Sequence, residues 1–109
     1  MDARLLYITA PNMDEARSLG RRLLERRLCA CVNMLPGMHA MYWWQDAIEE
    51  SEEVVLLCKT TMGKVQSCID AVRELHSYDI PCVVALPILA GNPDFLQWIE
   101  DETTPPAMA

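Results

Sequence analysis

The chain has 109 residues, of which 51% are hydrophobic, and its formal net charge is −7. This length predicts a single domain, and the hydrophobic content is typical of a folded globular chain rather than a disordered one. The one cluster of basic residues consists of four arginines on a predicted helix that also carries acidic residues. This pattern is typical of a helix face exposed to solvent. We therefore expect no nucleic-acid partner, because phosphate binding needs a basic surface.

The longest apolar run, residues 82–90, is too short to span a membrane, and the N-terminal residues do not resemble a signal peptide. Five cysteines are an odd number without a framework spacing. They indicate reduced thiols rather than a disulfide-stabilised secreted fold. We expect a cytoplasmic protein that does not interact with membranes.

The first elements are a strand and a helix. Residues 5–10 form a β-rich apolar run that predicts a strand, which Pro11 ends. Asn12 is a suitable helix N-cap, and Glu15 lies three residues later, where it can complete a capping box. Leucines and alanine then recur at helical spacing, which predicts an amphipathic helix over residues 13–27.

Residues 28–35 predict a second strand, which is broken at residues 36–37 and continues as an extended segment through Trp44. Soft and aromatic side chains gather between residues 29 and 44, so we expect this stretch to form the assembly contact and a pocket. Residues 45–47 predict a hairpin turn into a third strand over residues 48–61.

Thr61 is the expected N-cap of a second helix, which ends near His76. A loop over residues 77–81 leads to a fourth strand over residues 83–89. This strand contains Pro87, which cannot donate a hydrogen bond to a sheet, so the strand lies at an edge or a bulge.

Asn92 opens a short C-terminal helix, and residues 103–109 are expected to form a flexible tail after a single domain over residues 1–102. The element order is therefore β-α-β-β-α-β with one further helix. That order predicts an α+β class fold of the ferredoxin-like, split βαβ type, with two helices on one face of an antiparallel sheet.

Short motifs occur in a fixed order across residues 5–101. They are Thr9-Ala10-Pro11, Cys29-Ala-Cys-Val-Asn33, Pro36-Gly37, Tyr42-x-Trp44, Glu53-Val54, Lys59-Thr60-Thr61, His76-x-Tyr78-x-x-Pro81, Leu86-Pro87-Ile88, Gly91 and Phe95-Leu-x-Trp98. Each motif alone has little specificity, but the ordered set resembles the divalent-cation tolerance protein family, CutA.

The resemblance implies a ferredoxin-like protomer in a tight homotrimer, similar in architecture to the PII signalling proteins. A long hairpin corresponding to residues 38–58 helps to build the contact between subunits. Copper and other divalent cations are the ligands associated with the family, and no catalytic reaction is established for it. We therefore expect a metal-ion-binding trimer that contributes to copper tolerance and the response to metal ions. The alternative is a PII-like trimer that binds a small molecule or serves as a scaffold, without a metal role.

Two positions depart from the family motif His-Pro-Tyr-x-x-Pro-Glu, because Ser77 replaces its first proline and Cys82 replaces its glutamate. The second change removes a carboxylate that the resemblance places near Lys59 and Tyr78 in a cleft between subunits. The predicted cleft residues are Lys59, Tyr78, Trp44 and Cys82.

The predicted metal ligands are Cys31, His76 and Cys29. Two cysteines two positions apart face the same side of a strand and can offer two thiolates to a soft ion such as Cu(I). The alternative is that both cysteines pack in the core as small hydrophobic residues. His76 lies at a helix C-terminus, where it either fixes the loop or joins Tyr78 as a ligand.

Other side chains have both structural and functional interpretations. Lys59 either binds an anion in a cleft or pairs with a carboxylate across the subunit contact. Trp44 either stacks on a ligand or fills the trimer contact. His39 lies between two methionines, which can hold Cu(I) or fill gaps. A nucleophilic pair of Cys82 and His76 lacks an orienting third residue, so we expect no enzyme.

Overall fold

The computed structural model of the chain describes residues 2–104. Seven elements follow one another in the predicted order. They are β1 (Ala3–Ala10), α1 (Met13–Glu25), β2 (Cys31–Trp44), β3 (Ala47–Thr61), α2 (Met62–Leu75), β4 (Val83–Pro87) and α3 (Pro93–Thr103). The predicted α+β class and the β-α-β-β-α-β order with one further helix are confirmed.

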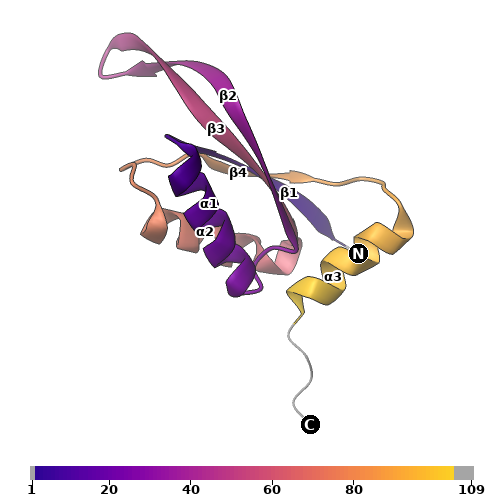
Figure 1. The fold of residues 1–109 in the computed structure, drawn as a ribbon. Helices are drawn as coiled ribbons and strands as arrows, with labels where there is room; N and C mark the ends of the chain where they lie inside the picture. Colours follow the sequence, from indigo (N-terminus) through magenta and orange to yellow (C-terminus); the bar gives the residue numbers. More distant parts are fainter. Residues whose placement is uncertain (1, 105–109) are drawn as a thin grey trace.

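The four strands form one sheet in the order β2-β3-β1-β4, and every neighbouring pair is antiparallel. α1 and α2 lie side by side on one face of this sheet, and α3 packs across the end where β1 begins and β3 ends (Figure 1). The face opposite α1 and α2, called the open face below, carries half-exposed and exposed side chains. Among them are Leu5, Tyr7, Cys31, Lys59, Val84 and Leu86.

The core lies between the sheet and the first two helices. It is made of apolar side chains that alternate along the strands and recur at helical spacing, as the sequence predicts. Its most buried members include Leu6, Ile8, Leu19, Leu23, Leu56 and Val72. Gly20 of α1 is needed for close packing, because a Cβ at this position would lie 3.1 Å from Cγ1 of Val32 on β2.

The N-terminus of α1 is capped by Asn12, whose Oδ1 accepts a hydrogen bond of 2.8 Å from the Glu15 amide. The expected capping box is not completed. The Glu15 carboxylate instead accepts hydrogen bonds from the amide and the hydroxyl of Ser77, at 3.1 and 2.9 Å. α1 also ends at Glu25, two residues earlier than predicted, because the chain turns through Arg27 at a φ of 58°.

β2 and β3 form a long hairpin whose outer half, residues 38–53, is called the arm below and extends beyond the helices (Figure 1). The predicted break at residues 36–37 is a shift of register between Leu35 and Met38, after which β2 continues to Trp44. A bulge of this kind admits a proline that a regular ladder excludes. The turn consists of Gln45 and Asp46, and both have the positive φ of a tight hairpin turn, 50° and 65°.

The second half of the chain departs from the predictions at element ends. Thr61 occupies the N-cap position of α2, but its side chain makes no capping hydrogen bond. β4 is an edge strand, as predicted, and it ends at Pro87. Thr103, expected to begin the tail, is the last residue of α3 and is buried. The rest of the predicted tail beyond Thr104 lies outside the described residues. Between residues 2 and 104, no helix has the length and hydrophobicity needed to cross a membrane.

Candidate functional site

A large hollow, called the cleft below, lies on the open face where the arm meets the sheet. Its volume is about 800 Å³, and β1, β2, β3 and the loop before β4 all contribute to its walls. Its aromatic side chains are Tyr7, Tyr42, Trp44 and Tyr78. The lining residues include the acidic Glu53 and Asp79 but no lysine or arginine, so the cleft favours cations over anions.

Glu53 is the buried carboxylate of the cleft, with only 7% of its surface exposed, whereas the other acidic residues of the arm are exposed. The Tyr78 hydroxyl donates a hydrogen bond of 2.9 Å to Glu53 Oε1. Burial, followed by the interaction with Glu53, raises the pKa of Tyr78 to about 12. The cleft therefore contains a carboxylate beside Tyr78 even though Cys82 replaces the glutamate of the family motif.

His76 is held by backbone groups on both sides of its ring. The Tyr78 amide donates to Nδ1 at 3.0 Å, so the proton lies on Nε2, which donates to the Thr9 carbonyl at 2.7 Å. Glu15 Oε2 lies 3.4 Å from Nδ1, and the His76 side chain has no exposed surface. These contacts match the loop-fixing role that the sequence left open, and a metal ion would have to displace one of them.

Cys82 lines the cleft as a half-buried thiol. Burial raises the pKa of Cys82, as does the nearby Glu53 charge, while a hydrogen bond with the Thr9 side chain opposes the shift. A protonated thiol is a weak nucleophile. Because the nitrogens of His76 are engaged by backbone groups, the structure does not form a Cys82–His76 nucleophilic pair.

Lys59 lies away from the cleft, at the opposite end of the open face. Its Nζ donates a hydrogen bond to Asn33 Oδ1 and lies 3.8 Å from Cys31 Sγ. Within one protomer, the structure therefore brings together three of the four predicted cleft residues, Tyr78, Trp44 and Cys82, and leaves Lys59 apart.

Cys29 and Cys31 do not face the same side of a strand, so that prediction is wrong. Cys29 precedes β2 and is buried in the core, where its Sγ lies 3.8 Å from Cys68 Sγ on α2. Cys31 begins β2 and points to the open face beside Lys59. The rule of alternation failed because residues 28–30 are not part of a strand.

The described residues of one protomer hold no ready-made metal site. In the part of the chain that the structure describes, no group of three or more His, Cys, Asp or Glu side chains is arranged to hold a metal ion. The predicted ligands Cys31, His76 and Cys29 lie in three different environments: beside Lys59, beside Thr9, and in the core.

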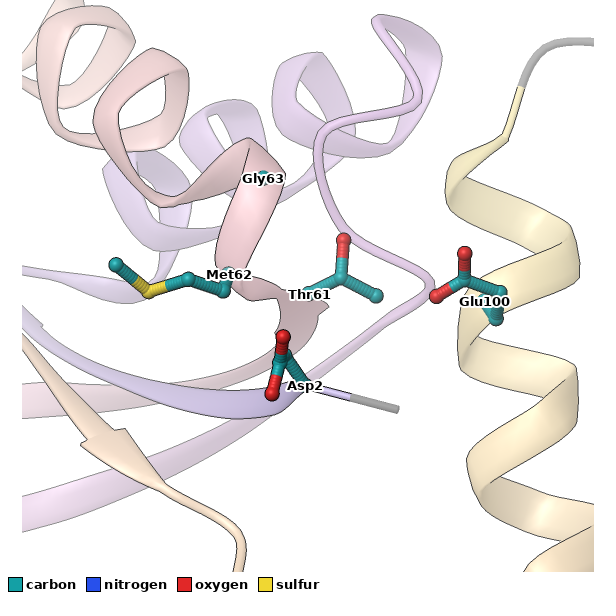
Figure 2. A pocket seen from close by; sticks show the side chains of 5 residues that line it. All are labelled: Asp2, Thr61, Met62, Gly63 and Glu100. Atoms are coloured by element: carbon teal, nitrogen blue, oxygen red, sulfur yellow. The ribbon is translucent and has the colours of Figure 1, made fainter.

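A second hollow of about 480 Å³ lies at the N-terminus of α2, between this helix and α3 (Figure 2). Figure 2 shows the carboxylates of Asp2 and Glu100 beside Thr61, Met62 and Gly63. A helix N-terminus attracts anions, but two carboxylates repel them. This hollow therefore offers no consistent site for a charged ligand.

Known proteins resemble this chain over nearly its whole length. Residues 4–102 match the profile of the family described as CutA1 divalent ion tolerance protein. The divalent-cation tolerance protein CutA of Archaeoglobus fulgidus is 42% identical over 96 residues, which are 88% of this chain and 93% of that protein. The protein of the same name from Thermus thermophilus is 40% identical over 99 residues, 91% of this chain and 96% of that protein.

Solved structures give the same result for the fold. The crystal structure of CutA from Xylella fastidiosa superimposes with a TM-score of 0.93, at 36% identity, over 95% of this chain and all of that chain. The structure described as the periplasmic divalent cation tolerance protein CutA from Archaeoglobus fulgidus has a TM-score of 0.91, at 39% identity. It covers 94% of this chain and 99% of that chain. These matches confirm the resemblance that the ordered motifs indicate.

Proposed function

Because the chain belongs to the CutA family of divalent-cation tolerance proteins, we propose that it works as a homotrimer that binds copper or other divalent cations and catalyses no reaction. The observation that supports cation binding is the cleft, whose charged lining residues are acidic. Its sulfur donors, the Cys82 thiol and the Met38 thioether, suit a soft ion such as Cu(I).

The donors of the proposed cation site come from neighbouring positions of the cleft. Glu53 offers a carboxylate, Cys82 a thiol, and Met38 a thioether directly across the β2–β3 ladder from Glu53. Cys31 is the predicted ligand that the open face leaves partly accessible, whereas Cys29 is buried. We expect a second copy of the chain to bring further donors, Cys31 among them, to the cleft.

Association into a trimer is supported by the surface that one protomer leaves uncovered. Val84 and Leu86 of β4 and Trp44 of the arm are about half exposed. Exposed large apolar side chains of this kind are expected where another subunit covers them.

Calorimetric titration of the reduced, metal-free protein with Cu(I), Cu(II) and Zn(II) tests the site. We expect Glu53→Gln and Cys82→Ser each to weaken copper binding by about tenfold or more, the cost of losing one charged or soft donor. Cys31→Ser tests the contribution of the second copy in the same way. His76→Ala tests whether a ring nitrogen of His76 leaves its backbone partner to bind the metal ion.

The matched control is Glu50→Gln, which removes an exposed carboxylate of the arm and should leave the affinity unchanged. If none of the variants Glu53→Gln, Cys82→Ser and Cys31→Ser changes the affinity for copper, the cleft is not the metal site. Sedimentation equilibrium of the same samples measures the assembly, and a single folded chain at micromolar concentration would exclude the trimer.

The absence of catalysis is supported by the state of the two most nucleophilic candidates. The Cys82 thiol has a raised pKa, and His76 is engaged by backbone groups. A cytoplasmic location is supported by five free cysteines, which suit a reducing compartment. Cell fractionation tests the location. Loss of an assayed activity on alkylation of Cys82 would overturn the non-enzymatic assignment.

The alternative is a PII-like trimer whose cleft binds a small molecule, and it is favoured by one observation. The walls of the cleft are aromatic, with Tyr7, Tyr42 and Trp44 facing a volume large enough for a metabolite. An anionic ligand held by Lys59 would need that lysine from another subunit, because it lies away from the cleft of its own chain. A thermal-shift screen with metabolites, without metal, separates this alternative from the first proposal.

A further inference from the structure

The carboxylate of Glu53 is nearly buried in the cleft and has no positive charge to balance it. Only 7% of Glu53 is exposed, and its Oε1 accepts a hydrogen bond of 2.9 Å from the Tyr78 hydroxyl. Among residues 2–104, none of the ion pairs includes Glu53. A buried charge without an opposite charge is costly, so a cation that enters the cleft would be bound favourably.

The strand pairing places aromatic side chains on the same face as this carboxylate. Met38 lies directly opposite Glu53 in the β2–β3 ladder, and opposite residues share a face. Side chains alternate along a strand, so Tyr42 and Trp44 lie on the same face of β2 as Met38. Both rings line the cleft, and they are 42% and 45% exposed, so they lie nearer the solvent than the carboxylate.

Tyr78 connects the rings of the arm to the buried charge. It comes from the loop before β4, and its hydroxyl contacts Glu53. The charge of an ionised Tyr42 contributes to the raised pKa of Tyr78, so the two phenols lie near each other. The carboxylate and the aromatic walls are therefore assembled by three separate parts of the chain without any ligand.

Aromatic walls around a negative charge suit one class of cation. Rings offer a metal ion no donor atoms, whereas their π faces attract ammonium groups that carry alkyl substituents. Such a cation is held by charge and by ring faces, so it needs no set of coordinating side chains. The lining residues include no lysine or arginine that would repel it.

We propose that the cleft binds an organic ammonium ion with apolar substituents, for which Glu53 provides the balancing negative charge. The rings of Tyr42, Trp44 and Tyr78 form the walls around the ion. The volume of about 800 Å³ also accommodates an aromatic or aliphatic substituent on the nitrogen. The inference rests on the second proposed function, binding of a small molecule in the cleft, and names the chemical class of that molecule.

The test is calorimetric titration of the metal-free, full-length protein in its assembled state, at constant ionic strength, with three probes of similar size. Benzyltrimethylammonium is the cation, benzyl alcohol the neutral comparison and benzenesulfonate the anion. Any side chain that a neighbouring copy adds to the cleft is thereby included. We expect the cation to bind more tightly than either of the other probes by about tenfold or more.

Equal binding of benzyl alcohol, or tighter binding of benzenesulfonate, would overturn the inference and leave small-molecule binding in place. If none of the three probes binds, the result counts against both. The titration with copper described above is independent of this result, because it uses no organic cation.

Two variants test the parts of the site. Glu53→Gln keeps the shape of the side chain and removes its charge, so we expect the affinity for benzyltrimethylammonium to fall by about tenfold or more. Tyr42→Leu keeps apolar bulk and removes a ring, so we expect a loss of about threefold. The matched controls Glu50→Gln and Trp43→Leu make the same kinds of change on the other face of the arm and should bind normally. Full affinity in both cleft variants would contradict the site.

A measurement on the wild type covers the case in which a variant does not fold. Nuclear Overhauser effects between the methyl protons of bound benzyltrimethylammonium and the protein identify the rings that surround the ion. Effects to Tyr42 and Tyr78 support the site. Effects confined to Phe95 and Trp98, the exposed stacked pair on α3 outside the cleft, would overturn it.

Discussion

The hydrogen bond between Tyr78 and Glu53 is the contact that gives the cleft its chemical character. Burial of the phenol, followed by its hydrogen bond to the almost fully buried Glu53 carboxylate, favours the neutral form and raises the pKa of Tyr78 to about 12 from an ordinary value near 10. A group whose pKa is raised by folding contributes its full stabilisation below its unfolded pKa. This contribution is therefore complete below pH 10 and is lost as the pH rises through 12.

We predict that Glu53→Gln lowers the pKa of Tyr78 toward its ordinary value, although not fully, because burial is the first cause of the shift. The ultraviolet absorbance of tyrosinate, followed against pH, measures it. The control Glu50→Gln should leave the titration unchanged. If all three tyrosines of the wild type ionise together near the ordinary value, the interpretation of this contact is wrong.

The cleft residues show which parts of a site can be predicted from a sequence. Trp44 and Tyr78 were selected because they belong to the ordered motifs, and Cys82 because it departs from one. The structure places all three in one hollow. Glu53 was not selected, because its burial depends on a loop residue 25 positions away, and nothing in an acidic run marks one member of it as buried.

The partner of Lys59 could not be predicted from the sequence for a related reason. The sequence shows that a lysine after a buried run needs a partner, but it does not identify that partner. Asn33, on the neighbouring strand, fills the role within the protomer.

At the scale of the elements, the two longer helices begin in different ways. The Asn12 side chain caps α1 with a hydrogen bond to the Glu15 amide, whereas the Thr61 side chain makes no such bond at α2. We predict that Asn12→Ala lowers the free energy of unfolding by about 1 kcal/mol and that Thr61→Ala changes it much less. Urea unfolding monitored by circular dichroism measures both, and equal losses would contradict the assignment of the caps.

Two helical glycines form a second matched pair. A Cβ at Gly63 would meet no atom within 4 Å, whereas a Cβ at Gly20 would press against Val32 at 3.1 Å. Alanine is the better helix former by about 0.5–1 kcal/mol. We predict that Gly63→Ala stabilises the protein, whereas Gly20→Ala destabilises it. Differential scanning calorimetry decides, and an increase in melting temperature for both variants would show that α1 does not depend on close approach to β2.

The predicted elements were correct where hydrophobic periodicity defines them and less accurate at their ends. α1 and β1 followed from their apolar spacing, and the core confirms it. The end of α1 was missed because the arginines that follow Glu25 have no signal for a turn, and β2 was divided at Pro36 because the bulge that admits this proline depends on pairing with β3. The residues around Pro36 do not reveal how β2 pairs with β3, so the bulge could not be predicted from them.

At the scale of the whole molecule, the arm makes the protomer elongated, with extents of 53 × 29 × 21 Å. The two neighbouring tryptophans of the arm point to opposite faces of the hairpin, because successive residues of a strand alternate. Trp44 lines the cleft on the open face, and Trp43 is 73% exposed on the other face.

We predict that Trp44→Ala weakens the proposed trimer, because a large aromatic side chain is lost from the interface, and that Trp43→Ala weakens it less. Sedimentation velocity over a dilution series measures the dissociation of both variants against the wild type. A larger effect of Trp43→Ala would place the contact on the other side of the hairpin.

The length of the arm also has a consequence for motion. Its backbone pairs only with itself and has no helix packed over it, so its opening costs less free energy than opening of the core. Deuterium should therefore replace the amide protons of residues 38–53 early in a dissociated chain. In the assembled protein the same protons should exchange late, because neighbouring subunits would have to separate first. The rate of this exchange would then report directly on how firmly the copies hold one another.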